Sequence, residues 1–369
     1  MKRREFLTYL PAAASATAFV GALGRSQDLW AAESPGSDWR TFELVTSATI
    51  VKPVGRTALW LPLPAGQSTD YQRTLSVSWE APGAARADRV TLPGYDVELL
   101  HVEWTEAQSA GPVTLTNKLA TRDRHVDPSA APAVAPKPES AQTLRKYLRP
   151  TALLPTDGIV SDTSKKITHG YRTDIEKARA LYEWVVENTN RDPKTPGCGI
   201  GDVASMLKSG YLGGKCADIN ALFVALARSA GIPARDAYGV RVADSRLGFK
   251  SLGRSGDITK AQHCRAEFYA ASHGWIPVDP ADVRKVVLEE PPGGLALDDA
   301  KVVKARSMLF GAWEMNWVAY NHGHDIALPG STKAPIPFLM YPNGETQEGR
   351  LDSLDPVGFK YEIHSRELT

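Results

Sequence analysis

Residues 213–218 read Gly-Gly-Lys-Cys-Ala-Asp, and an apolar run follows them as far as Gly231. Apolar residues recur in this run at the three- and four-residue spacing of a helix face: Leu222, Phe223, Leu226 and Ala230. Gly231 and then Pro233 are typical signals for the end of a helix. The stretch therefore predicts a loop that delivers Cys216 to the first turn of a buried helix. Polar side chains are expected only at its outer positions: Asp218, Asn220, Arg228 and Ser229.

A cysteine at a helix N-terminus has a lowered pKa, because unpaired backbone N–H groups and the helix dipole favour the thiolate. Gly213 and Gly214 allow backbone angles that other residues resist, and they leave room for a substrate chain. The alternative is that Cys216 is a small buried hydrophobic residue in an alanine-rich helix. The segment at 262–280 helps to decide whether Cys216 is a reactive thiol or a buried hydrophobic residue.

Two short strand-like runs in 262–280 flank a turn-like segment at 271–274, which indicates a hairpin. One register makes one face of this hairpin wholly apolar and places His263 opposite Asp279. It pairs Cys264 with Val278 and Ala266 with Ile276. The other face then carries His263, Arg265, Glu267, Trp275 and Asp279. The spacing thus predicts an imidazole beside a carboxylate on neighbouring strands.

Cys216, His263 and Asp279 can fill the three roles of a cysteine catalytic triad. A thiolate nucleophile needs a base within hydrogen-bond reach, and the base needs a third group that fixes its tautomer. Taken singly, His263 could be a structural histidine, and Asp279 a turn or cap residue before Pro280. Their combination with the glycine-delivered cysteine favours the triad.

These segments resemble the transglutaminase-like core, which is papain-like in architecture. The resemblance runs from the helix at Lys177–Val185, through the cysteine helix and its Ala-Gly-Ile-Pro-Ala-Arg end, to Gly274–Pro280. It covers about residues 150–290. It implies that Cys216 is the acyl-accepting nucleophile, that His263 is its base and that Asp279 orients the histidine. The residue after the histidine is often alanine in that family and is Cys264 here, on the opposite face from the triad.

The predicted fold class is α+β: an N-terminal β-sandwich-like domain, followed by a papain-like transglutaminase core with helices packed on an antiparallel sheet. Several short strands with turn residues between them fill 41–121. Residues 126–141 are rich in Pro and Ala, which is typical of an extended connector. The expected domains are a β-rich domain at 33–125, the connector at 126–150, the catalytic domain at 151–325 and a β tail at 326–369. The tail is a candidate to pack on the N-terminal domain.

The N-terminus has the pattern of a signal peptide, expected to span residues 1–32. Arg3-Arg4 before Phe6-Leu7 indicates the twin-arginine export route and a periplasmic location. The apolar stretch is too short to predict a membrane span, so no stable membrane insertion is expected after cleavage. Removal of residues 1–32 changes the formal net charge from +1 to −1. Such a near-neutral chain has no basic footprint for nucleic acid.

Several segments are candidates to line a cleft around Cys216. The Gly- and Pro-rich loop at 193–201 is expected to form one wall, and the polar excursion at 243–260 to form a border. Tyr211 is a candidate oxyanion donor beside the backbone N–H of Cys216. Gly214 and Lys215 are further oxyanion or cleft candidates.

The chain contains three cysteines, Cys198, Cys216 and Cys264. Outside the cytoplasm, a disulfide between Cys198 and Cys264 is one option for the two that are not nucleophiles. A Cys/His zinc site is disfavoured because His263 and Cys264 point to opposite faces of one strand. With no further ligand or phosphate-loop motif, no cofactor and no metal are expected.

The sequence predicts an enzyme that transfers acyl groups from peptide or protein amides through a thioester on Cys216. With water as acceptor it is a peptidase or amidase, and with an amine it is a transglutaminase, because the two reactions share their first step. Of these two reactions, hydrolysis is preferred over transfer to an amine. The alternative is a non-catalytic periplasmic protein that binds peptides or polymers on the same scaffold, since fold alone does not secure function.

Overall fold

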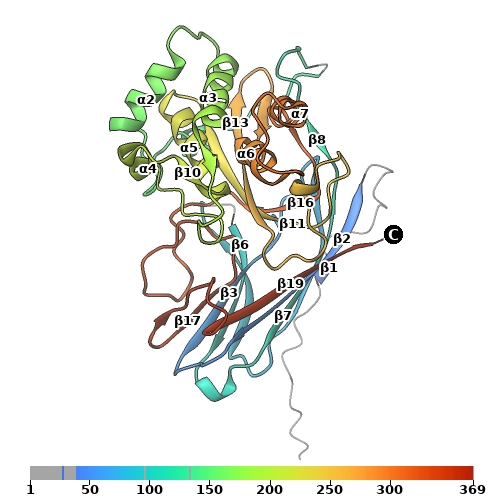
Figure 1. Ribbon diagram of the computed structural model, residues 1–369. Coiled ribbons are helices and arrows are strands. Elements are labelled where there is room, and N and C mark those ends of the chain that lie inside the picture. Colours follow the sequence, from blue (N-terminus) through green and yellow to red (C-terminus); the bar gives the residue numbers. More distant parts are fainter. Residues whose placement is uncertain (1–26, 29–38, 95–96, 133, 369) are drawn as a thin grey trace, which may run out of the picture.

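A computed structural model describes residues 27–28, 39–94, 97–132 and 134–368 (Figure 1). The predicted signal peptide, residues 1–32, lies outside the described residues except for β1 (Gln27–Asp28). Within these ranges, no helix is both long and apolar enough to cross a membrane.

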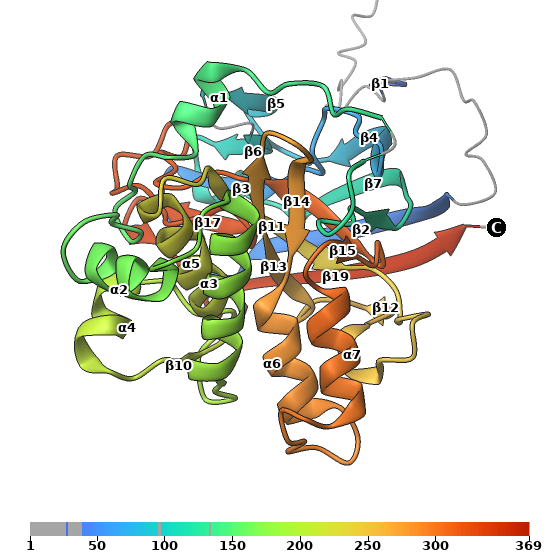
Figure 2. The same cartoon turned by 90° about the horizontal axis from the view of Figure 1, so that it is seen from above.

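The half of the molecule that holds Cys216 is built on a four-stranded antiparallel sheet in the order β14-β13-β11-β16. Its strands are β11 (Ala234–Arg241), β13 (Gln262–Ala270), β14 (Gly274–Val278) and β16 (Trp317–Asn321). Helix α5 packs directly against β13 and β11, helices α2, α3, α4 and α6 pack around it, and α7 packs on α6 (Figures 1 and 2). The helices are α1 (Ala141–Lys146), α2 (Gly158–Thr168), α3 (Asp174–Asn188), α4 (Val203–Ser209), α5 (Cys216–Ser229), α6 (Pro280–Glu289) and α7 (Ala300–Met308).

The other half consists of a six-stranded sheet, β1-β4-β7-β2-β19-β12, and a five-stranded sheet, β18-β17-β3-β6-β5. Their strands are β2 (Arg40–Ile50), β3 (Thr57–Pro62), β4 (Gln72–Glu80), β5 (Arg86–Leu92), β6 (Val97–Trp104), β7 (Val113–Thr121), β12 (Gly256–Asp257), β17 (Asn343–Thr346), β18 (Gly349–Arg350) and β19 (Phe359–Leu368). One apolar cluster joins residues from both sheets, among them Leu61 and Leu115. The two sheets therefore form a sandwich, and the predicted α+β class is confirmed.

The sandwich and the core sheet share a third apolar cluster. It joins Phe42 and Ile363 of the six-stranded sheet to Val240 and Val318 of the core sheet. Strand β19 pairs with β2 along ten positions, so the C-terminal segment lies in the sheet that begins near the N-terminus. A short pair, β8 (Arg124–His125) with β15 (Ala312–Trp313), adds a second link. The C-terminal third of the chain thus contributes to both halves.

Helix α5 is buried on all sides, and the prediction that its polar residues face outward is wrong. Asp218, Asn220 and Arg228 are only 8%, 0% and 4% exposed. The sheet covers one side of the helix, and α2, α3 and α6 pack on the others. Buried polar groups need partners, and Arg228 donates to the carbonyl oxygens of Ala234 and Arg149.

The hairpin between β13 and β14 has a different register from the predicted one. It pairs Ala266 with Val278, whereas the prediction paired Ala266 with Ile276. Gly274, at φ +75°, starts β14 directly after the turn, and this moves the centre of the hairpin by one residue. The partner of each residue therefore changes by two positions, which keeps every side chain on its predicted face. His263 and Asp279 still share a face, as diagonal rather than opposite neighbours.

Candidate active site

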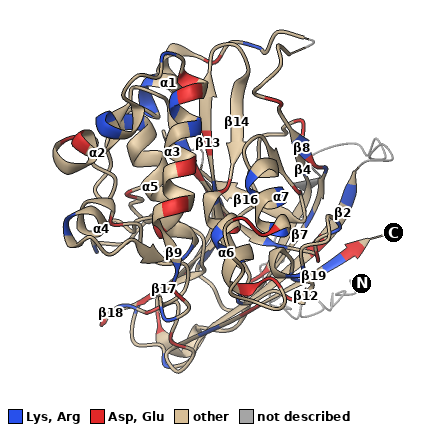
Figure 3. Ribbon diagram, turned by 45° about the horizontal axis from the view of Figure 1, so that its top comes forward, with Lys and Arg blue, Asp and Glu red and all other residues tan. Residues whose placement is uncertain are grey.

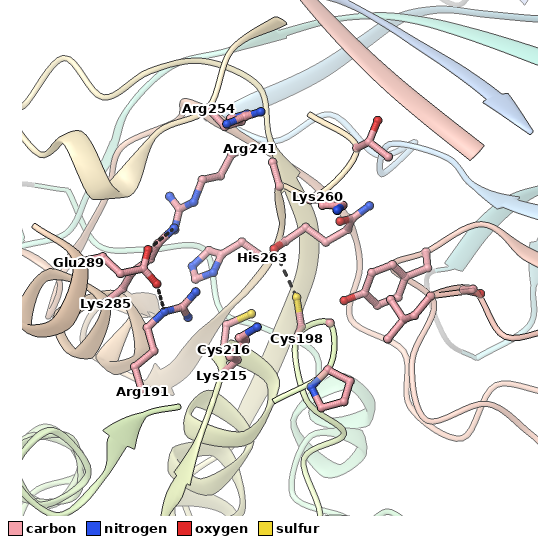
Figure 4. A pocket seen from close by; sticks show the side chains of 18 of the residues that line it. Arg191, Cys198, Lys215, Cys216, Arg241, Arg254, Lys260, His263, Lys285 and Glu289 are labelled. Atoms are coloured by element: carbon pink, nitrogen blue, oxygen red, sulfur yellow. Dashed lines mark hydrogen bonds and ion pairs between the residues drawn. The ribbon is translucent and has the colours of Figure 1, made fainter. Parts of the chain in front are cut away.

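Cys216 is the first residue of α5, as the sequence predicts. The loop before it forms β10 (Gly213–Gly214), which pairs in parallel with β9 (Asn190–Arg191). Residues in the first turn of a helix have backbone N–H groups without intrahelical acceptors, and the helix dipole favours negative charge there. The Cys216 residue is 3% exposed and lies at the wall of a cavity (Figure 4). Its position therefore suits a thiolate.

Asp218 joins the cysteine loop to the Gly/Pro-rich loop at 193–201. Its Oδ1 accepts hydrogen bonds from the backbone N–H groups of Ile200, at 3.1 Å, and Gly201, at 2.9 Å. Its Oδ2 accepts one from the backbone N–H of Lys215 at 2.9 Å. Gly199 has φ +85°, and a Cβ atom there would lie 1.8 Å from Asp218 Oδ2. Only glycine lets the loop come this close to the carboxylate.

His263, on β13, is held by Asp279 at the N-cap of α6. His263 Nε2 lies 2.7 Å from Asp279 Oδ2. Asp279 Oδ1 accepts from the backbone N–H of Asp282 at 3.0 Å and is 3.3 Å from Asn220 Nδ2. Because Nε2 is engaged by a carboxylate, Nδ1 is the ring nitrogen left for the Cys216 thiol, and the two residues line the same cavity. The structure thus brings Cys216, His263 and Asp279 together.

A second carboxylate, which the sequence interpretation missed, also faces His263. Asp282 Oδ1 lies 3.3 Å from His263 Nε2 and 2.5 Å from Arg241 Nη2. The signal was present: an Asp followed by Pro is a typical N-cap and first helical residue. This assigns residue 282 to the first turn of the helix that Asp279 caps. All of these charged groups are at most 4% exposed.

The charges around His263 favour its protonated form. Burial alone would lower the pKa of His263, but the carboxylates of Asp282 and Asp279 outweigh burial and the opposing charge of Arg241, and they raise it. Burial also acts on Asp282, yet Arg241 and His263 hold the pKa of Asp282 far below its usual range. Burial and the neighbouring Asp282 raise the pKa of Asp279. An imidazolium on His263 is therefore well compensated.

The other two thiols flank Cys216. The neighbouring thiols of Cys198 and Cys264, together with His263, hold the pKa of Cys216 well below its usual value, although burial opposes this. The Cys198 Sγ itself donates a hydrogen bond to the Gln262 carbonyl at 3.3 Å. The pKa values of Cys198 and Cys264 are raised, by the neighbouring Cys216 and by burial respectively. Cys216 carries the charge because it alone lies at a helix N-terminus beside the imidazole. All three thiols are free, and Cys198 and Cys264 form no disulfide in this structure.

Cys216 and His263 open onto a cavity of about 860 Å³ (Figure 4). Pro196, Gly197 and Cys198 form one wall, as predicted for the 193–201 loop. Six residues of the 243–260 excursion border the cavity, also as predicted: Lys250, Ser251, Gly253, Arg254, Thr259 and Lys260. The excursion lines this space without filling it, so a chain of substrate size has room beside the thiol.

A known family model covers the segment that holds this site. The family described as the transglutaminase-like superfamily matches residues 161–280, a range that contains Cys216, His263 and Asp279. An uncharacterized protein of Haemophilus influenzae is 36% identical over 348 residues, which cover 90% of this chain and 93% of that protein. The chain belongs to the transglutaminase-like superfamily.

Solved structures that resemble this superfamily member do so at low sequence identity. One from Cytophaga hutchinsonii has 16% identity and a TM-score of 0.49, covering 89% of this chain and 99% of its own. The periplasmic domain of TgpA from Pseudomonas aeruginosa, bound to ethylmercury, has 15% identity and a TM-score of 0.35, covering 62% and 90%. The family assignment rests on the superfamily match and on the Haemophilus influenzae relative.

Of the other residues predicted to line the cleft of this transglutaminase-like chain, some line the cavity and others do not. Tyr211 is 55% exposed, its hydroxyl donates to Asp192 Oδ2 at 2.8 Å, and it lies outside the described lining of the cavity. Gly214 is buried against Asp218 and is also outside that lining. Lys215 does line the cavity. The structure therefore does not place Tyr211 or Gly214 where an oxyanion would form.

One group of side chains has the spacing of a metal site. Ligand atoms of His263, Asp279 and Asp282 all lie within 4.8 Å of one another. However, Arg241 is bonded to Asp282, and Arg265 Nε lies 3.6 Å from Asp279 Oδ2. These guanidinium groups already compensate the carboxylates, and a metal would also displace the Nε2–H that Asp279 accepts. The cluster fits an oriented imidazolium better than a cation site.

Proposed function

We propose that this protein is a cysteine-dependent acyltransferase or hydrolase that acts on peptide or protein amides. The observation that carries the proposal is His263, which has Nε2 fixed by two carboxylates and lines the same substrate-sized cavity as Cys216 (Figure 4). A thiolate at a helix N-terminus beside an imidazolium is an activated nucleophile.

The proposed reaction has two steps. The Cys216 thiolate attacks the amide carbonyl carbon, and the negative charge that develops on the oxygen is stabilised by the backbone N–H of Cys216. His263 donates its Nδ1 proton to the departing amine, the C–N bond breaks and a thioester remains. Water or a second amine then attacks the thioester, His263 takes the proton of the attacking group, and the thiolate leaves. Hydrolysis is the preferred outcome, and transfer to an amine is the other.

The first test is the reactivity of Cys216 in the mature chain. Alkylation by iodoacetamide is followed by mass spectrometry from about pH 4 to pH 10, in wild type and His263→Ala. We expect a thiolate profile with an apparent pKa below the ordinary thiol value of about 8.5, and we expect it to be lost in the variant. Asp299→Asn, at the N-cap of α7 and outside the described lining of the cavity, serves as the matched control and should keep a reactive Cys216. Slow alkylation with an ordinary thiol profile in every protein would support the non-catalytic binding protein instead.

The second test separates the two acceptors. The protein is incubated with a peptide library in the presence and absence of a fluorescent alkylamine, and Cys216→Ala is the control. Shortened peptides that depend on Cys216 indicate hydrolysis, and fluorescent peptides indicate transamidation. If neither product depends on Cys216, the acyl-transfer proposal fails for peptide amides.

We also propose that the protein acts in the periplasm, because its N-terminus has the twin-arginine pattern. Cell fractionation of the full chain tests this, with Arg3→Lys/Arg4→Lys as the variant. Wild type should appear in the periplasmic fraction and the variant should remain inside the cell. Equal distribution of the two would contradict twin-arginine export.

A further inference from the structure

The cavity around Cys216 is strongly cationic, although the whole chain is almost electrically balanced. The full sequence holds 43 Lys and Arg residues against 42 Asp and Glu. Figure 3 shows the two signs mixed over the helices and strands. Seven basic side chains line the cavity: Arg191, Lys215, Arg241, Lys250, Arg254, Lys260 and Lys285. Among the described lining residues, Glu289 is the one carboxylate.

Internal ion pairs account for only some of these charges. Arg241 is paired with Asp282, and Arg191 and Lys285 share Glu289. The other four have no carboxylate partner within ion-pair distance among the described residues: Lys215, Lys250, Arg254 and Lys260. Unpaired positive charge around a concave site with low-dielectric walls attracts anions and raises their local concentration.

These unpaired cations come from segments that border the reacting groups. Lys215 directly precedes Cys216, and the other three belong to the excursion that leads into the His263 strand. Figure 4 shows labelled basic side chains on several sides of Cys216 and His263. The cavity also has an apolar part from the C-terminal segment: Tyr341, Leu354, Pro356, Phe359 and Tyr361. A ligand that matches both parts is a peptide that carries several carboxylates beside its reacting amide.

We propose that the natural acyl donor is an acidic peptide, with carboxylates on the residues next to the amide that Cys216 attacks. This inference rests on the proposed function, because it names the substrate class of the same site. Lys250, Arg254 and Lys260 act as positioning residues that attract and orient the carboxylates. Their long, exposed side chains can reach a flexible acidic segment without a preformed geometry.

The first experiment needs no substrate. Cys216 of the mature chain is alkylated with iodoacetate, which is anionic, and with iodoacetamide, which is neutral and of similar size. The ratio of the two rate constants is measured for wild type and for Lys250→Gln/Arg254→Gln/Lys260→Gln, at about 20 mM and 500 mM salt. Both proteins keep His263, so any difference in the ratio reports the three removed charges. The matched control is Lys52→Gln/Lys166→Gln/Lys333→Gln, which removes three charges from exposed sites outside the described lining.

We expect the ratio to fall about tenfold in the cavity variant at low salt, to fall much less at high salt, and to stay at the wild-type value in the control. An equal ratio in all three proteins would overturn the inference. The result is independent of the proposed function: slow alkylation by both reagents would refute the activated thiol, yet the ratio would still report the field at Cys216.

The second experiment uses three peptide libraries that are identical except for the two residues on each side of the central residue. These are Glu, Gln or Lys. Cys216-dependent conversion should have the lowest KM for the Glu library, and the cavity variant should raise that KM with little change in kcat. Equal conversion of all three libraries would contradict an acidic donor while leaving acyl transfer intact. A third outcome is that no library is converted, while the iodoacetate-to-iodoacetamide ratio still falls in the cavity variant as expected. This outcome would contradict the proposed function alone.

Discussion

Replacement of Asp279 by Asn removes a negative charge from His263 while it keeps the shape of the site. Asp279 Oδ1 accepts the backbone N–H of Asp282 and lies near Asn220 Nδ2, and an asparagine oxygen can take over both contacts. Asn is also as good an N-cap as Asp, so α6 should be retained. The amide nitrogen of the new side chain then faces His263 Nε2, where it needs an acceptor. The variant therefore favours the tautomer with the proton on Nδ1, which cannot accept the thiol proton.

The expected loss of the thiolate–imidazolium pair in Asp279→Asn can be estimated from the 2.7 Å contact between Asp279 Oδ2 and His263 Nε2. A charge partner at such a distance shifts a pKa by about 1–3 units, and each unit corresponds to about 1.4 kcal/mol. The shift is downward for His263, because the lost carboxylate favoured the imidazolium. The thiolate–imidazolium pair then becomes about 10- to 1,000-fold less populated relative to the neutral pair. Asp282, 3.3 Å from the same nitrogen, limits the loss, so we expect the lower part of this range.

The assay is the pH dependence of Cys216 alkylation by iodoacetamide. In wild type, reactive thiolate should be present over a plateau that starts at low pH. In Asp279→Asn this plateau should shrink, and most of the reactivity should appear only near the ordinary thiol pKa of about 8.5. Asp279→Asn/Asp282→Asn should lose more of the low-pH reactivity of Cys216 than the single variant does, because neither of these carboxylates then faces His263 Nε2.

Asp299→Asn is the matched control. Asp299 caps α7 by accepting the backbone N–H of Lys301, and it is absent from the described lining of the cavity. The control should keep both the profile and the melting temperature of wild type. If Asp279→Asn also keeps the wild-type profile and its rates stay within about twofold, Asp279 is a helix cap and no more, and the argument for an oriented histidine is refuted.

Three further predictions address the surrounding structure. Asp218→Ala leaves three backbone N–H groups without their acceptor at about 1–3 kcal/mol each, so urea unfolding should show a loss of several kcal/mol and proteolysis should cut first at 193–201. Burial opposes ionisation of Glu267, but Arg124 and Arg235 lower its pKa to about 2, so its contribution to stability is present above pH 4.5 and is lost as the pH falls toward 2. Glu267→Gln should therefore cost about 3–5 kcal/mol at neutral pH, and this difference from wild type should shrink in acid. Tyr211→Phe should change the alkylation rate less than twofold, and a large loss would restore Tyr211 as an oxyanion donor.

Much of the fold could be predicted from the sequence, because the strongest sequence signals are local. The periodicity of 216–230 and the glycine after it predict α5, and its first residue is Cys216 as expected. The hairpin register could not be predicted as securely, because it depends on which turn residue takes positive φ. Gly274 takes it here, and the register differs from the predicted one by two residues. Each side chain of the hairpin still lies on its predicted face, because side chains alternate along a strand with a period of two.

The candidate site was predicted in part for a related reason. His263 and Asp279 share a face in either register, so their proximity does not depend on the turn. The sequence places Asp282 in the first turn of α6, but its 3.3 Å contact with His263 depends on where the fold puts that turn, which is a tertiary fact. Tyr211 was misplaced because only the fold shows that its hydroxyl turns outward to Asp192. Long-range packing therefore decides which polar residues near Cys216 reach the cavity.

The polar residues of α5 explain why a helix that is buried on all sides is not wholly apolar. Cys216 supplies the thiol, Asp218 fixes the loop that forms one wall, and Asn220 contacts the carboxylate that holds His263. Asn220 Nδ2 also donates to the Cys264 carbonyl at 2.7 Å, which ties α5 to the strand of that histidine. Buried polar groups are costly unless their partners are complete, and a satisfied network makes a core rigid and specific. One helix thus sets the positions of the nucleophile, the cavity wall and the base together, so a shift of α5 would disturb all three at once.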